Sequence, residues 1–594
     1  MNNALKASSN DKIISKLFFR LLPVQILLVG IPSLNGIISS LFASNMLGED
    51  AMTAIGMYAP IVQFITAISN VFLGGSQILC GKYMGGNQVE RTQEIFSLNI
   101  TAVSITAVIA SVLMASAGAF QMTGFMNPDP GVIAMFNRYL IGCAIGLLPM
   151  MLGSQLSAFL SLELEGSRST IATALFVVTN LVLTWLFVGV LHMQAFGLAL
   201  AASIGYWVYL TVELLYYFSG KSLLKLKMVR FRMPDLSDII LIGFPGATTA
   251  LYLTIRRFVL NGMITRYVGN AGMSAFTASD TLLAIFWAVP LGMANVCRML
   301  MSVSYGEEDR QSLKDVFKTM VGRCLLIQLA MIVVLILLAV PFTRFFIRDV
   351  SDPVYQMTAT AFRLMPLTMP LGLVCQAWLN YGQVSRKQVL THSLALIDGM
   401  LCPCLAMLAL VPVFGMNGIY YALIVNGVVT VVYPMIYSII VNRGIPKTLD
   451  RLLMIPDTFG APEEDRLDIS LHSDEEVVTI AEQVQRFCEE KGLEERKAYL
   501  SGLFLEEMAG NIVDHGFTKD KKEHSVDVRV VYKDGDVILR LKDDCIPFDP
   551  KQRADIADPD DITKNFGIRM VYSMAKDITY QNILGLNVLT IRIP

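Results

Sequence analysis

The chain of 594 residues is 54% hydrophobic and only 16% charged, with a formal net charge of −2. This composition excludes a single soluble domain. Charges are sparse and mostly basic before residue 442, and dense and rich in acid after residue 457. Most of the nine cysteines lie within apolar runs, which favours buried thiols over a disulfide framework.

Twelve apolar segments follow one another from residue 17 to residue 441. A helix that crosses a bilayer needs about 20 mostly apolar residues. The first segment is too long for the core of a signal peptide and has no clear cleavage site, so we expect it to be retained. The predicted spans are 17–43, 52–80, 95–120, 132–161, 170–191, 195–218, 237–264, 272–301, 320–346, 354–380, 388–411 and 417–441.

A basic segment from Lys221 to Pro234 separates the first six spans from the last six. Lysine and arginine also concentrate in the other even-numbered connections, and such residues mark the cytoplasmic side. We therefore expect a multi-pass protein of the plasma (inner) membrane, with both termini and the C-terminal domain in the cytoplasm. The basic residues of the segment are Lys221, Lys225, Lys227, Arg230 and Arg232.

The two runs of six spans resemble each other. Residues 52–96 align without gaps with 273–317, and residues 168–197 with 386–415. Because six is an even number, both halves face the same way and form a parallel repeat about an axis along the membrane normal. The predicted fold class is thus a polytopic α-helical membrane protein with 12 spans in two six-helix lobes, followed by a cytoplasmic α/β-sandwich.

Short turns at matching places carry a family resemblance. They are Leu47-Gly48, Gly85-Gly86, Tyr305-Gly306, Glu165-Gly166 and Tyr381-Gly382. Over about residues 15–442 the chain resembles the multidrug and toxic compound extrusion (MATE) family. The resemblance implies an exporter of drugs or small organic compounds with a central V-shaped cavity, coupled to re-entry of Na⁺ or H⁺. The family often has an acid in the first span, but here residues 38–41 contain none.

Charged residues within the predicted spans are concentrated in the second half. Each costs about 2.5–3.5 kcal/mol at a helix centre, so such residues tend to face a cavity or a partner of opposite charge. In one interpretation they form a transport cavity in which Asp280 or Asp398 couples a cation. In the other, the arginines of span seven pair with these acids and fix helix packing. The residues are Arg256, Arg257, Asp280, Arg363 and Asp398.

Three more charged residues, Glu163, Glu165 and Arg298, lie near the predicted cytoplasmic ends of spans. We expect them to belong to a gate or an interface.

The sequence after residue 464 predicts strands at 467–471, 525–532, 536–542 and 587–593. Ser473 and Glu476 are spaced as in a capping box, which predicts a helix running to about Lys491. A second helix is expected from Glu494 to His515. On it Glu507, Asn511 and His515 are four residues apart and therefore share one face.

These motifs, in this order, resemble the GHKL ATPases, and among them the anti-sigma-factor serine kinases, over about residues 465–594. The resemblance implies ATP and Mg²⁺ as cofactors. Glu507 matches the general base, Asn511 the ligand of Mg²⁺ and Asp543 the acceptor of the adenine amino group. Phe548, Asn565 and Gly567 match other nucleotide-binding positions. Cys545 and Asn565 stand where the family usually has glycine, so binding without hydrolysis stays open.

The expected boundaries are 1–220 for the first lobe, 221–236 for the basic hinge, 237–442 for the second lobe, 443–464 for a linker and 465–594 for the ATP-binding domain. No Walker-type loop is present, so ATP hydrolysis is not expected to drive export.

Two hypotheses follow for the whole protein. In the first, it is a secondary exporter whose ATP-binding domain regulates transport or phosphorylates a partner. In the second, it is a membrane-anchored serine kinase whose transporter-like lobes sense a ligand, with ATP-dependent kinase or ATPase activity in residues 465–594. The expected partners are an export substrate, membrane lipid and a small cytoplasmic regulatory protein that bears Ser or Thr, without nucleic acid.

Overall fold

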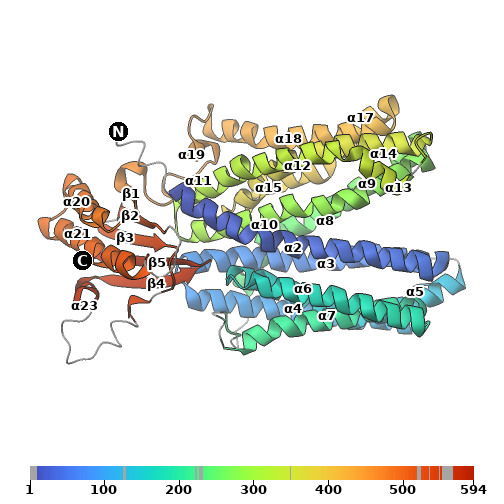
Figure 1. The fold of residues 1–594 in the computed structure, drawn as a ribbon, viewed down its shortest axis with the longest axis horizontal. Coiled ribbons are helices and arrows are strands. Elements are labelled where there is room, and N and C mark those ends of the chain that lie inside the picture. Colours follow the sequence, from blue (N-terminus) through green and yellow to red (C-terminus); the bar gives the residue numbers. More distant parts are fainter. Residues whose placement is uncertain are drawn as a thin grey trace.

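The computed structural model describes residues 10–124, 129–220, 222, 224–226, 232–347, 349–517, 524–533, 535–547, 549–551 and 566–594. In this part of the chain, a long helical bundle carries a smaller α/β domain at one end (Figure 1). Helices α2–α7 are called the first lobe, helices α8–α18 the second lobe, and the segment from β1 to β5 the C-terminal domain.

The first lobe is built from long helices that run along the bundle. They are α2 (Asn10–Met46), α3 (Gly48–Gly85), α4 (Val89–Ala119), α5 (Pro130–Leu162), α6 (Gly166–Thr184) with its π-helical continuation η1 (Trp185–Val190), and α7 (Gln194–Phe218).

The second lobe is more interrupted than the first. It comprises α8 (Met233–Tyr267), α9 (Asn270–Phe286), α10 (Ala288–Gly306), α11 (Arg310–Thr319), η2 (Met320–Cys324), α12 (Leu325–Leu337), α13 (Ala339–Phe346), α14 (Pro353–Leu364), η3 (Met365–Leu367), α15 (Thr368–Val384), α16 (Gln388–Leu396), η4 (Ile397–Leu401), α17 (Cys402–Phe414) and α18 (Met416–Asn442).

Eleven helices in the described ranges are long and apolar enough to cross a membrane. A twelfth span results if α9 and α10, which meet at an angle of 41°, are counted as one. The sequence predicted a continuous span at 272–301, and the structure bends it at Trp287. Pro290 lies in the first turn of α10 and has no N–H to donate to the carbonyl of Phe286, so a straight helix through this segment would lack that hydrogen bond and crowd that carbonyl.

Glycines let the two lobes approach closely at the end of the bundle near the C-terminal domain. A Cβ on Gly306 of α10 would overlap the backbone carbonyl of Lys82 in α3. A Cβ on Gly85 of α3 would in turn overlap the carbonyl of Val303. Small residues at such crossings permit backbone-to-backbone packing between membrane helices. The lobes are therefore in direct contact at this end.

The C-terminal domain is an antiparallel sheet of order β1-β2-β3-β5-β4 with helices packed on one face. Its elements are β1 (Arg466–Leu471), α20 (Glu475–Glu490), α21 (Glu495–Gly516), β2 (Val526–Lys533), β3 (Asp536–Asp543), α23 (Phe566–Met574), β4 (Asp577–Ile583) and β5 (Leu586–Ile593). Val528 and Leu541 pair across β2 and β3 and face Phe504 of α21 in the core. This is the expected α/β-sandwich.

Two local features of this domain differ from expectation. The edge strand β4 was not predicted, because its residues 577–583 have no clear alternation of apolar and polar side chains. Helix α20 begins at Glu475, and no side chain caps its first turn. The expected capping box does not form, because Glu476 Oε2 accepts at 2.8 Å from the backbone N of His472 and not from that of the predicted cap, Ser473.

We expect Gly306→Ala to lower the thermal stability of the purified full-length protein. The added methyl group would meet backbone atoms, which cannot rotate away, and overpacking of this kind costs about 1–3 kcal/mol. Gly262→Ala in α8 is the matched control, because no atom lies within 4 Å of its Cβ position. Equal melting temperatures for the two variants would contradict the close approach of the lobes.

Candidate functional site

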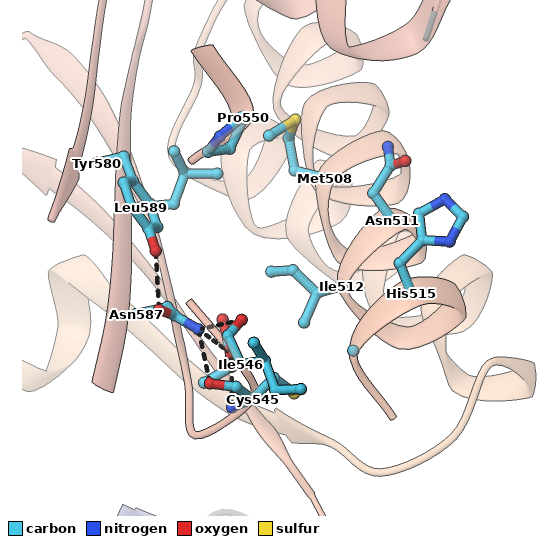
Figure 2. A pocket seen from close by; sticks show the side chains of 12 residues that line it. Met508, Asn511, Ile512, His515, Cys545, Ile546, Pro550, Tyr580, Asn587 and Leu589 are labelled. Carbon is cyan, nitrogen blue, oxygen red and sulfur yellow. Dashed lines mark hydrogen bonds between the residues drawn. The ribbon is translucent and has the colours of Figure 1, made fainter. Parts of the chain in front are cut away.

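A pocket in the C-terminal domain lies between α21 and the sheet. Its empty space, open solvent included, is about 540 Å³. In Figure 2, Asn511 and His515 lie on the helix across the pocket from Tyr580, Asn587 and Leu589 of the sheet. The lining residues are Met508, Asn511, Ile512, His515, Gly516, Asp543, Cys545, Ile546, Pro550, Tyr580, Asn587 and Leu589.

Asn587 joins the strands on the sheet side of the pocket (Figure 2). Its Nδ2 donates to Asp543 Oδ1 at 2.8 Å and to the carbonyl of Cys545 at 3.2 Å. Its Oδ1 accepts from the hydroxyl of Tyr580 at 2.8 Å. Sequence reasoning did not single out this residue. The feature of the sequence that could have identified Asn587 is its position as a polar residue near the start of a mostly apolar strand.

Asp543 is the buried carboxylate of the pocket, with 3% of its surface exposed. The backbone N of Cys545 also donates to its Oδ1, at 2.9 Å. Burial raises the pKa of Asp543 above its ordinary range, because desolvation disfavours the charged form. A carboxylate at the edge of an apolar pocket is suited to accept a hydrogen bond from an amino group on a planar ring.

Helix α21 presents its predicted site residues to two places. Asn511 and His515 line the pocket, and Asn511 Nδ2 donates to the carbonyl of Glu507 at 2.5 Å. Glu507 does not line it. Its carboxylate instead occupies the space that a Cβ on Gly567, at the start of α23, would fill. The predicted face of α21 thus holds all three residues, and Glu507 lies beside the predicted phosphate-binding glycine.

Glycine at 516 makes room for Cys545. A Cβ at Gly516 would lie 2.8 Å from the sulfur of Cys545. Cys545 is also not one of the non-glycine residues with a positive φ in the described part of the chain. A cysteine in place of the usual glycine therefore requires no left-handed backbone here.

Several predicted residues lie outside the described ranges. Phe548 and Asn565 of the nucleotide site are among them, as are Lys221, Lys227 and Arg230 of the basic hinge.

A second cavity lies between the two lobes. Its empty space, open solvent included, is about 1,660 Å³. It is lined from α2, α3, α5, α6 and α7 of the first lobe and from α8, α10 and α15 of the second. Most of its polar lining residues carry amides or hydroxyls, and Arg298 is also among them. The sequence placed Arg298 near the end of a span, whereas the structure places it in the wall of this cavity.

The MatE family model matches residues 27–186 and 245–391, which together make up more than half of the chain. The chain belongs to the MatE family. The model of the histidine kinase-like ATPase domain matches residues 472–593. The combination expected from the sequence, a MATE transporter followed by a GHKL-type domain, is confirmed. No curated protein matches the chain.

Solved MATE structures have the same fold as the two lobes. A crystal structure of MATE in complex with MaL6 has a TM-score of 0.67 at 17% identity and covers 73% of this chain and 98% of its own. A second structure is that of a MOP superfamily transporter from Pyrococcus furiosus, for which the reverse polarity of the binding pocket is said to suggest a different function. It has a TM-score of 0.65 at 17% identity and covers 72% of this chain and 97% of its own. At such identity the likeness concerns the fold alone.

The charged residues predicted for the transport cavity are not among the residues that line the cavity between the MATE lobes. Arg257 forms an ion pair with Asp280 at 2.7 Å, as one interpretation of the sequence expected. Asp398 lies in the π-helical segment η4 and accepts from Asn426 Nδ2 at 2.9 Å. Arg256 lies near Asp398, and Arg363 of α14 is exposed.

The ATPase-like domain binds the second MATE lobe through the face of its sheet opposite the helices. Lys542 Nζ lies 2.8 Å from Glu307 Oε2, and Arg529 forms an ion pair with Asp309. The acids belong to the turn between α10 and α11. Arg529 and Arg540 are directly opposite each other in the sheet, a pairing of like charges that is unfavourable by itself. The carboxylates of this turn and of the sheet offset that repulsion.

These interface charges are almost fully shielded from solvent. The side chains of Lys542 and Glu307 are 7% and 3% exposed, and those of Arg529 and Asp309 are 11% and 3% exposed. Burial alone would raise the pKa of Asp309, but the charges of Arg529 and Lys542 prevail and lower it. Asp309 also caps α11, since its Oδ1 accepts from the backbone N of Ser312 at 2.8 Å.

The ATPase-like domain also contacts the first MATE lobe. Lys16 of α2 lies 2.5 Å from Asp544, the residue between Asp543 and Cys545 of the pocket. The pKa of Asp544 is lowered because hydrogen bonds from Lys16 and His524 outweigh its burial. The tip of the β4–β5 hairpin, residues 583–586, packs into the main hydrophobic core of the lobes.

The segment that leads to the ATPase-like domain packs against the second lobe. The hydroxyl of Tyr381 donates to the carbonyl of Leu453 at 2.5 Å, and Lys387 Nζ donates to that of Met454 at 2.8 Å. Phe459 stacks on Tyr305, with 4.8 Å between ring centroids. These contacts fix the connecting segment to the surface of the second lobe.

We expect the affinity of the full-length protein for ATP to fall as the pH is lowered from neutral, because the carboxylate of Asp543 is the form that accepts hydrogen bonds. Its raised pKa means that protonation begins above the ordinary range of an aspartate. Asp543→Asn should weaken binding by about tenfold at neutral pH and should lack this step of the pH profile. Binding of a fluorescent ATP analogue measures both effects.

The phosphates of the nucleotide titrate equally for every variant, so the difference between variants isolates Asp543. Asp577→Asn, at an exposed position at the start of β4, should retain the profile of the wild type. An Asp543→Asn variant whose affinity and pH profile equal those of the wild type would contradict this assignment.

Proposed function

We propose that the protein is a cation-coupled secondary exporter of drugs or small organic compounds, whose C-terminal domain binds ATP in the cytoplasm and regulates transport. One observation carries the proposal: the ATPase-like domain binds both MATE lobes at the same end of the bundle. It contacts the first lobe through Lys16 and the hairpin tip 583–586, and the second through the acidic turn 307–309.

Alternating access supplies the physical reason. Transporters built from two repeats move the repeats relative to each other, so that a central site opens first to one side and then to the other. Opening at this end of the bundle would separate Gly306 from Lys82. A domain bound to both lobes there opposes that separation, and a ligand that changes the binding shifts the equilibrium between conformations.

The nucleotide pocket is well placed to change that binding. Asp543 lies in the pocket, and the next residue, Asp544, forms the ion pair with Lys16 of the first span. An adenine amino group would bond to Asp543, while Asn511 offers an amide oxygen, a suitable ligand for Mg²⁺. The carboxylate of Asp543 and the amide of Asn511 are groups that suit ATP with its Mg²⁺. Binding would therefore act on the residues that hold the domain to α2.

For the coupling ion, Na⁺ or H⁺, we propose Asp398 ahead of Asp280. Asp398 is within a distorted part of its helix and is hydrogen-bonded to Asn426. Asp280 is already neutralised by the ion pair with Arg257, and both side chains of that pair are more than a third exposed.

We expect Asp309→Asn to make transport insensitive to nucleotide. Asparagine can still cap α11, but it takes one carboxylate from each of Arg529 and Lys542, which keep Asp468 and Glu307 as charged partners. The loss of a negative charge in this buried interface should weaken the contact between the domain and the second lobe. The measurement compares substrate efflux from proteoliposomes with and without a non-hydrolysable ATP analogue on the side of the domain. The ratio of the two rates should move to about one.

The control for this experiment is Asp352→Asn. Asp352 also caps its helix, α14, because its Oδ1 accepts from the backbone N of Val354 at 2.8 Å. Within the described ranges it forms no ion pair with the ATPase-like domain. It should keep the wild-type ratio. A wild-type protein with equal rates in both conditions would remove the regulatory role and leave a transporter that carries a docked domain.

A second function, phosphorylation of a small cytoplasmic protein on Ser or Thr, is supported by the position of Glu507 beside Gly567. If Glu507 is the general base, Glu507→Gln should abolish phosphoryl transfer, since the amide cannot take the proton. Nucleotide-dependent regulation of efflux should persist. Transfer of radiolabelled phosphate from ATP to cytoplasmic extract proteins tests this, with Glu506→Gln, at the exposed neighbour, as control.

A further inference from the structure

The cavity between the lobes offers a single charged side chain to a ligand. Of the residues that line it in the described part of the chain, Arg298 alone carries a formal charge. The remaining polar lining residues are neutral amides, hydroxyls and phenols, such as Gln25, Asn70 and Tyr209. No carboxylate is among them. The cavity therefore has an excess of one positive charge.

Arg298 has little compensation from the protein. Its Nη2 donates to Asn295 Oδ1 at 3.4 Å, a long hydrogen bond, and its buried Nε has no hydrogen-bond partner. It forms no ion pair with any residue that the structure describes. This sets it apart from Arg257, which pairs with Asp280.

Glu213 of α7 is a buried acid close to Tyr209 in the wall of this cavity. It is 0% exposed and is not part of the lining. Its Oε2 would lie 3.6 Å from a Cβ on Gly153, on the same side of that residue as the ring of Tyr209. Tyr209 itself lines the cavity, so a ligand meets the tyrosine and not the carboxylate.

An uncompensated guanidinium within a membrane protein is costly, and such residues usually pair with a group of opposite charge. Arginine is suited to bind a carboxylate, sulfonate or phosphate through two parallel hydrogen bonds. A ligand with an anionic group would thus supply the partner that the protein does not provide.

The apolar part of the cavity indicates the rest of the ligand. Phe176 and Tyr206 both line it, and their rings are stacked with centroids 4.5 Å apart. Leu28 and Leu73 contribute aliphatic surface. Such a wall favours a planar aromatic group, because rings prefer offset-stacked or edge-to-face contacts with other rings.

We propose that the cavity binds an aromatic organic anion, whose anionic group is held by Arg298. The proposal deepens the exporter function by assigning a class of substrate, and it rests on that function only for the statement that the bound anion is transported. Binding itself depends on the cavity alone.

The test uses two dyes on the same xanthene ring system, the anionic carboxyfluorescein and a cationic rhodamine. Their binding to the full-length protein in lipid nanodiscs is measured by fluorescence anisotropy. The wild type should bind carboxyfluorescein at least about tenfold more tightly than the rhodamine. Arg298→Met should weaken binding of carboxyfluorescein by about tenfold or more. Arg298→Lys, which retains the charge, should lose less.

Arg363→Met is the matched control, because Arg363 is an exposed arginine of the second lobe that does not line the cavity. It should bind both dyes as the wild type does. A wild type that prefers the rhodamine would overturn the proposal even if the Arg298→Met variant failed to fold. So would a folded Arg298→Met variant with unchanged affinity for carboxyfluorescein.

Transport is measured separately, so that the two proposals can fail independently. Carboxyfluorescein bound through Arg298 but not moved by a Na⁺ or H⁺ gradient in proteoliposomes would overturn the exporter function and leave the anion site intact. Gradient-driven movement of the rhodamine alone, without that of carboxyfluorescein, would overturn the anion site and leave the exporter function intact.

Discussion

The arrangement of the whole molecule depends on a buried set of opposite charges. The turn at residues 307–309 places carboxylates against Lys542 and Arg529 of the sheet, with almost no exposure to solvent. Without the turn, the sheet would keep Asp468 as a partner of Arg529, but Lys542 would lose both Glu307 and Asp309. Because removal of one member of a buried pair leaves the other unpaired at high cost, the domain and the second lobe are specified together.

This interface joins the ATPase-like domain to the two lobes of the transporter. The turn that the ATPase-like domain holds begins at Gly306, the position at which α10 passes within backbone contact of α3 in the first lobe. The nucleotide pocket is one residue away from the ion pair with Lys16 of α2. A ligand in the pocket would therefore lie next to the residues that contact the first lobe. The face of the sheet opposite the helices binds the second lobe. That proximity is the structural basis of the proposed regulation by nucleotide.

The two lobes share an architecture but differ in where their charges lie. In the second lobe, Arg257 and Asp280, to which the sequence draws attention, neutralise each other in a partly exposed ion pair. In the central cavity, amides and hydroxyls surround Arg298. Hydrophobic periodicity does not distinguish these two situations, since both place an arginine in an apolar helix. The difference between a paired and an unpaired charge decides which one is available to a ligand.

The sequence by itself determined the two lobes, the basic connection and the α/β domain, because apolar length and strand alternation depend on neighbours along the chain. The family of the domain followed from the resemblance of its short motifs. It also determined that Glu507, Asn511 and His515 share a helix face. Only the tertiary structure decided that Asn587 holds Asp543, that Gly516 accommodates Cys545 and that Arg298 lies in the central cavity. It alone revealed that Glu307 and Asp309 bind Lys542 and Arg529. These relations join residues that are tens to hundreds of positions apart in sequence, and no local pattern encodes which distant side chain meets which.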